Sequence, residues 1–145
     1  MIVLLAACHK EKQPFWEQLN ELTGDDGVKR WEVTGYRVDM EDRTGAYRDS
    51  CGCVFEFRKY NHELNLLDCH SEIVGWVHNA GFILSRVFPY IRLSVGSNIK
   101  NFDSPYRTHS SVAWEFILHN EKSMILQTES DNHVYSMTLE AIKYK

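Results

Sequence analysis

The chain has 145 residues, with 20 acidic against 16 basic side chains and a formal net charge of -4 when histidine is neutral. Its 43% apolar, 12% aromatic and 25% charged residues are close to the average for globular domains. This composition excludes a disordered chain, a collagen-like repeat and a polytopic membrane protein. The length predicts one domain, and the acidic excess argues against a nucleic-acid-binding protein, which normally presents a basic face.

An apolar run opens the chain and ends at Leu5-Ala6-Ala7-Cys8, of which the last three residues are small. The abrupt change to polar residues that follows is typical of the end of a secretory signal. The four residues resemble the bacterial lipobox, in which the cysteine receives a diacylglycerol and becomes the mature N-terminus. We therefore expect residues 1–7 to be a signal-peptide remnant, Cys8 to be the lipidation site and residues 8–13 to be a tether. An N-terminal strand over residues 2–7 is the alternative.

A lipid on Cys8 would anchor the protein to a membrane without spanning it. The next residue is His9, whereas an aspartate at this position tends to retain lipoproteins at the inner membrane. We therefore expect the protein in the bacterial cell envelope, at the outer membrane, on its periplasmic or surface face.

The first regular element expected after the tether is a short helix from Pro14 to Leu22. Proline suits the first helical position, and Gly24 suits the stop. Phe15, Leu19 and Leu22 share one face of this helix. A helix this short is not stable alone, so we expect its apolar face to pack on the rest of the domain.

From residue 30 onward, apolar and polar residues alternate as in strands. The expected strands cover residues 31–38, 53–58, 64–67, 73–77, 82–87, 90–95, 112–119, 124–128 and 134–144. Gly35 marks an expected bulge, residues 39–50 and 96–111 are expected loops, and Leu118 is expected to share a face with Phe116. Short turns make neighbouring strands antiparallel, and closure removes exposed edges. The prediction is an all-β, antiparallel up-and-down barrel of about eight strands with one short N-terminal helix, forming a single domain over residues 14–145.

Four cysteines are present: Cys8, Cys51, Cys53 and Cys69. If the expected hairpin is centred on Asn61, Cys53 and Cys69 lie directly opposite each other, within reach of a disulfide. A register shift of one residue would place them on opposite faces. Free buried thiols are one alternative. A metal site of Cys51, Cys53, Cys69 and His70 is another, although alternation sends Cys69 and His70 to opposite faces.

Two groups of residues carry a family resemblance. Near the start they are Leu22-Thr23-Gly24, Lys29-Arg30-Trp31 and Val33-Thr34, and near the end Trp114-Glu115-Phe116, Met124-Ile125-Leu126 and Tyr135-Ser136-Met137-Thr138-Leu139. They resemble the lipocalin-like lipoproteins of Bacteroidetes-type bacteria, in which a lipobox precedes a short helix and a first strand with a tryptophan. The resemblance implies an antiparallel barrel, a membrane tether and a small apolar ligand, with no established chemistry.

The residues expected to line a ligand inside the barrel are Trp31, Phe55, Phe57, Trp76, Phe82, Trp114 and Phe116. An eight-stranded barrel has room either for side chains or for one small ligand. Plain core packing of these aromatic residues is therefore the alternative.

No catalytic, metal-binding or cofactor-binding motif stands out. His109 and Ser110 are adjacent and Asp103 is near, but no Gly-x-Ser-x-Gly motif accompanies them. We expect no enzymatic activity, no metal and no cofactor. The sequence favours a lipid-anchored envelope protein that binds a small apolar ligand. The alternatives are a structural or protein-interaction module with a filled barrel, whose contact surface includes an exposed Tyr106, and an envelope hydrolase.

Overall fold

The computed structural model describes residues 14–50, 52–67, 81–84, 90–94, 104–107, 109 and 111–142. These residues contain two α-helices and nine strands. In chain order they are α2 (Pro14–Thr23), β1 (Val28–Val38), β2 (Glu41–Asp42), α3 (Thr44–Ser50), β3 (Val54–Arg58), β4 (Glu63–Leu67), β5 (Gly81–Leu84), β6 (Tyr90–Ser94), β7 (Ser111–His119), β8 (Ser123–Ser130) and β9 (His133–Ala141). Two 3₁₀ turns, η1 (Tyr60–His62) and η3 (Pro105–Arg107), complete the set.

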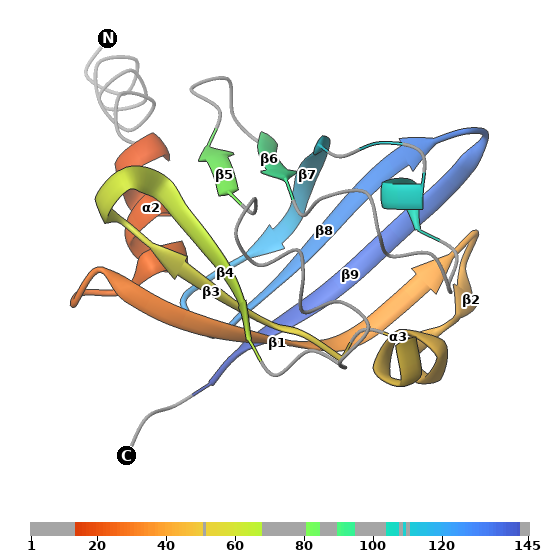
Figure 1. Ribbon diagram of the computed structural model, residues 1–145. Helices are drawn as coiled ribbons and strands as arrows, with labels where there is room; N and C mark the ends of the chain where they lie inside the picture. The colour runs from red at the N-terminus through yellow and green to blue at the C-terminus, as the bar shows by residue number, and fades with distance from the viewer. Residues whose placement is uncertain are drawn as a thin grey trace, which may run out of the picture.

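Eight of the strands form a closed barrel (Figure 1). The order is β1, then β3 to β9 in sequence, and β9 pairs again with β1. All pairs are antiparallel, and β2 only extends a hairpin from the end of β1. The structure therefore confirms the predicted all-β, up-and-down, lipocalin-like barrel with a short N-terminal helix, which runs from Pro14 to Thr23.

Strand direction assigns each connection to one of two ends. The end covered by α2, here called the α2 end, also holds η1 and the β7–β8 turn at residues 120–122. The opposite end, here called the far end, holds the β1–β2 turn, α3, η3 and the β8–β9 turn at residues 131–132 (Figure 1).

Alternation along the strands places one apolar face inside the barrel. Six of the seven predicted inward residues are buried in a single hydrophobic core: Trp31, Phe55, Phe57, Phe82, Trp114 and Phe116. Trp76 and the predicted strand over residues 73–77 lie outside the described residues. Period-two alternation was sufficient to identify this face because it depends on local backbone geometry alone.

Several predictions differ from the structure. Residues 39–50 are not simply a loop, because they contain β2 and α3. Leu118 is about half exposed, as is Ile117, because the pairing of β7 with β8 shifts between Phe116 and Leu118. Such a bulge adds one residue and turns the following side chain to the other face. Tyr106 is buried rather than exposed, so it is not part of a contact surface.

The predicted bulge at Gly35 is present, because the pairing of β1 with β9 shifts between Val33 and Gly35. A Cβ atom added to Gly35 would lie 3.2 Å from the side chain of Thr138. The absence of a side chain therefore allows β1 to approach β9 where the barrel closes.

Candidate functional site

The α2 end is closed by direct contacts between the helix and β1. Leu19 and Leu22 are buried in the core, and the indole N–H of Trp31 donates a 2.9 Å hydrogen bond to the carbonyl oxygen of Leu22. Thr23 is also buried and donates its hydroxyl to the carbonyl of Leu19 at 2.6 Å. The apolar face predicted for this helix therefore covers one end of the barrel.

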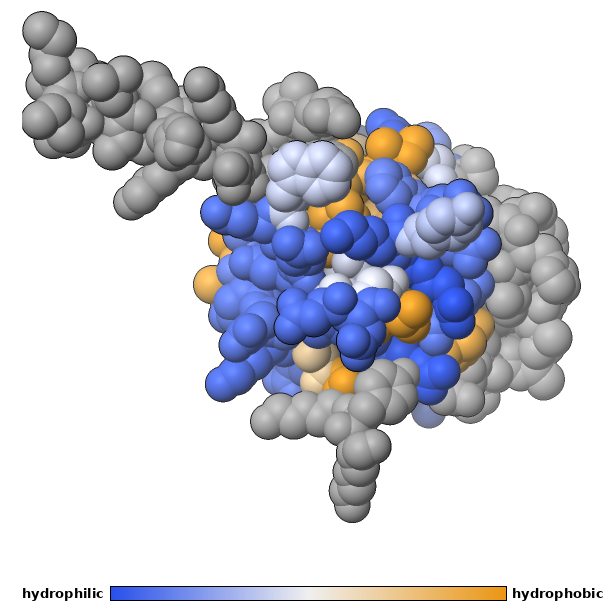
Figure 2. All heavy atoms as spheres, turned by 90° about the vertical axis from the view of Figure 1, so that its left-hand side faces the viewer, coloured by the Kyte–Doolittle hydropathy of each residue, from blue (hydrophilic) through white to orange (hydrophobic). Residues whose placement is uncertain are grey.

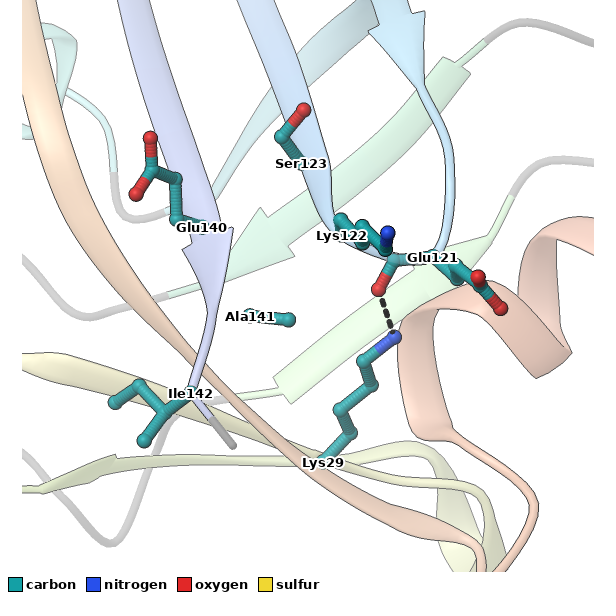
Figure 3. A pocket seen from close by; sticks show the side chains of 7 residues that line it. All are labelled: Lys29, Glu121, Lys122, Ser123, Glu140, Ala141 and Ile142. Carbon is teal, nitrogen blue, oxygen red and sulfur yellow. Dashed lines mark hydrogen bonds between the residues drawn. The ribbon is translucent and has the colours of Figure 1, made fainter. Parts of the chain in front are cut away.

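Lys29 links the helix to the β7–β8 turn. Its Nζ donates to the backbone carbonyl of Glu21 at 2.8 Å. It also donates to the backbone carbonyl of Glu121 at 2.6 Å (Figure 3). The same ammonium group lies 4.5 Å from the centre of the Trp31 ring. Burial lowers the pKa of Lys29 below its ordinary value, although the nearby Glu121, Glu21 and Asp25 oppose the shift. His119 adds a second link, with its Nδ1 at 2.7 Å from Oε2 of Glu21.

A hollow of about 500 Å³ opens beside Lys29 at this end. Figure 3 shows its lining residues: Lys29, Glu121, Lys122, Ser123, Glu140, Ala141 and Ile142. The Lys29 ammonium is already bonded to two carbonyl oxygens, and the other charged groups are exposed to solvent. The two backbone hydrogen bonds therefore give Lys29 a structural role at the edge of the hollow.

At the far end, Tyr106 on η3 is buried in the hydrophobic core. Its hydroxyl donates to the carbonyl of Leu93 at 3.1 Å and accepts a 2.8 Å hydrogen bond from the indole N–H of Trp114. Burial raises the pKa of Tyr106 well above its ordinary value, despite the bond from Trp114. The hydroxyl therefore stays protonated and fixes the orientation of Trp114 in the barrel wall.

Cys53 lies where α3 meets the barrel, and it is disulfide-bonded, so it is neither a free thiol nor a metal-binding thiolate. Its carbonyl accepts a 2.8 Å bond from the hydroxyl of Tyr47 on α3. The pairing of Val54 with Leu67 centres the β3–β4 hairpin between residues 60 and 61. This register is one residue away from the predicted one, which would set Cys53 opposite Cys69. The partner of Cys53 lies outside the described residues.

Two further sets of predicted residues also lie outside the described residues. One holds Cys8, Cys51, Cys69 and His70, and the other holds Asp103 and Ser110. Within the described residues, no three His, Cys, Asp or Glu side chains are grouped so that they could bind a metal ion.

The inner wall is rich in aromatic rings. Phe57 packs edge-on against Phe55 and Phe82, with ring centres 6.3 and 5.2 Å apart, and Trp31 and Trp114 are fully buried. The buried carboxylate of Glu56 is on the outer face instead, where it binds Arg30 and Arg58. The described wall therefore presents apolar and aromatic surface inward and keeps its ionic contacts outside.

Sequence reasoning missed one polar residue at this site, Gln18, whose side chain is buried under α2. Helix phase could have found it, because Gln18 is four residues before Leu22 and three after Phe15, on the face predicted to be apolar.

Comparisons with protein-family models, with curated proteins and with solved structures found no match. In the described part of the chain, no helix has the length and hydropathy needed to cross a bilayer. The resemblance to lipocalin-like lipoproteins therefore stays a prediction.

Proposed function

We propose that this chain is a non-enzymatic, lipid-anchored protein of the bacterial cell envelope that binds a small apolar molecule inside its barrel. The observation that carries the proposal is the closed barrel with an apolar, aromatic inner wall and a helix or 3₁₀ turn over each end. Barrels of eight strands can enclose one small ligand, and apolar walls with a few polar groups are typical of ligand sites.

The distribution of exposed apolar residues supports a membrane tether at Cys8. Trp16, Val28 and Tyr60 are exposed at the α2 end, and Figure 2 shows apolar and pale aromatic side chains among hydrophilic ones on this face. Cys8 precedes Pro14 by six residues, a length of chain that spans at most about 20 Å. A lipid on Cys8 would therefore hold the α2 end towards the outer membrane, where aromatic side chains are favourable.

A structural or protein-interaction module is the second candidate, and a patch on the outer wall favours it. Ile83, Tyr90 and Ile117 are exposed on the neighbouring strands β5, β6 and β7. Ile83 pairs with Arg92, so it is a diagonal neighbour of Tyr90 on β6. Tyr90 pairs with Glu115, so it is in turn a diagonal neighbour of Ile117 on β7. Contiguous exposed apolar surface of this kind is typical of protein contacts.

Titration of the full-length Cys8→Ser chain with the apolar fluorophore N-phenyl-1-naphthylamine separates the two candidates. We expect saturable fluorescence enhancement with one site per chain. The double variant Tyr90→Ser/Ile117→Ser removes the outer patch and should leave the titration unchanged if the fluorophore enters the barrel. Loss of the signal in that variant would place the site on the outer wall, and no saturable signal in either chain would contradict the proposal.

The anchor is tested separately by expressing the gene from its own locus with a C-terminal tag and labelling the cells with an alkynyl fatty acid. We expect label and membrane association for the natural chain, and loss of both for Cys8→Ser. A labelled Cys8→Ser chain, or an unlabelled natural chain, would contradict lipidation at Cys8.

A further inference from the structure

Gln18 is a buried polar side chain on α2. It is 3% exposed, and within the part of the chain that the structure describes neither its Nε2 nor its Oε1 has a hydrogen-bond partner. Buried polar groups in native proteins nearly always have a partner, so an unpaired amide at this depth requires an explanation.

The position of Gln18 in α2 places it on the helix face that packs on the barrel. Residues four apart lie on one helix face, so Gln18 shares the face of Leu22, whose carbonyl binds the indole of Trp31. Leu19, the next residue along, is part of the hydrophobic core. The amide therefore lies on the inward face of α2, at the end of the barrel whose inner wall is apolar and aromatic.

For stability alone, glutamine is an unfavourable residue at position 18. A leucine or methionine would fit the helix equally well and would bury no unpaired group. We propose that Gln18 is the polar contact of the ligand site, and that it binds an uncharged hydrogen-bonding group at one end of an otherwise apolar molecule. This inference rests on the proposed function of the barrel and specifies the class of its ligand.

The chemistry of the site sets the charge of that group. An amide offers two donors and one acceptor oxygen, which suits a hydroxyl, an amide or a protonated carboxyl group. A buried carboxylate would need a paired cation. Of the cations described at this end, Lys29 is bonded to the carbonyls of Glu21 and Glu121, and Lys59 to the side chain of Asn20. The ligand is therefore neutral at its polar end, as in a long-chain alcohol or amide.

The test compares 1-dodecanol with 1-chlorododecane, which has the same chain and no hydrogen-bond donor. Each competes with N-phenyl-1-naphthylamine for the full-length Cys8→Ser chain and for the same chain carrying Gln18→Leu. The control is Gln127→Leu, the same substitution at an exposed position on β8. We expect Gln18→Leu to reduce the preference for the alcohol, the ratio of the two Kd values, by about tenfold, which corresponds to one hydrogen bond. Gln127→Leu should leave the ratio unchanged.

Thermal unfolding without ligand gives an independent readout. We expect Gln18→Leu to raise the Tm, because it removes an unpaired buried amide, and Gln127→Leu to leave it unchanged. A lower Tm for both Gln18→Leu and Gln18→Met would mean that the amide already has a partner, such as a buried water, and would overturn the inference.

The outcomes separate this inference from the proposed function. An alcohol preference that is equal in the parent chain and in Gln18→Leu overturns the role of Gln18 and leaves ligand binding intact. If the two Gln18 variants do not bind the fluorophore but the parent does, Gln18 is structural and the inference fails. If the parent chain does not bind the fluorophore, the proposed function fails and the inference fails with it.

Discussion

At the scale of single residues, Glu56 holds the outer faces of three strands together. Its carboxylate accepts bonds from Arg30 at 2.9 Å, Arg58 at 2.8 Å and Asn65 at 3.0 Å. Arg30 and Asn65 are its directly paired neighbours on β1 and β4. Burial alone would raise the pKa of Glu56, but these bonds outweigh burial and hold the pKa below its ordinary value of 4.5.

The depressed pKa of Glu56 predicts how stability depends on pH. Its contribution is fully present above the unfolded pKa and is lost as the pH falls through the lower, folded pKa. We expect Glu56→Gln to lower the free energy of unfolding by about 1–3 kcal/mol at pH 7 and to flatten the loss of stability at acid pH, measured by urea unfolding. Glu41→Gln removes an exposed ion pair with Arg43, so it should change the free energy of unfolding by no more than about 0.5 kcal/mol at pH 7 or at acid pH. Equal effects at both sites would contradict this account.

At the scale of elements, α2 depends on Lys29 for its attachment to the β7–β8 turn. Lys29→Met keeps most of the apolar stem but leaves the carbonyls of Glu21 and Glu121 without this donor. We expect a loss of about 1 kcal/mol and faster hydrogen exchange in α2. The control is Lys122→Met at the rim of the same hollow, where exchange in α2 should stay as in the parent. Unchanged protection of α2 in Lys29→Met would refute the role given to this side chain.

Alanine substitutions at two glycines should change the stability of the protein in opposite directions. Gly35→Ala places a Cβ 3.2 Å from the side chain of Thr138, which must then shift by a few tenths of an ångström at the β1–β9 seam, and we expect a loss of about 1–3 kcal/mol. Gly45 lies in α3 with nothing within 4 Å of an added Cβ, and alanine there should add about 0.5 kcal/mol by reducing unfolded-chain entropy. Calorimetric Tm values should therefore shift in opposite directions. A Tm that rises or does not move in Gly35→Ala would show that the barrel seam is not tightly packed there.

At the scale of the whole molecule, sequence alternation was sufficient to predict the barrel, because short turns between strands leave few alternatives to antiparallel neighbours. It was not sufficient where long-range contacts decide. α3 forms in a polar segment because Tyr47 stacks on Tyr36 of β1, with ring centres 5.8 Å apart. Tyr106 is buried because Leu93 and Trp114 bind its hydroxyl, and none of these pairings is visible as a local pattern.

Part of the proposed ligand site could be predicted from the sequence. The inward aromatic residues follow from period-two alternation, but the burial of Gln18 depends on how α2 closes the barrel. The register of the hairpin beside Cys53 differs from the prediction by one residue, because the turn occupies residues 60–62 with Asn61 and His62 both at positive φ. A turn of this geometry is set by backbone conformation and was not specified by the apolar pattern.

The central claim is that the barrel carries a small apolar molecule, and native mass spectrometry tests it most directly. The protein should be purified from its natural envelope in mild detergent and measured before and after extraction with organic solvent. A covalent lipid on Cys8 would remain after extraction, whereas a molecule inside the barrel would be lost. We predict one additional mass per chain that disappears on extraction. An identical mass before and after would contradict a carrier function and would favour a barrel filled by its own side chains.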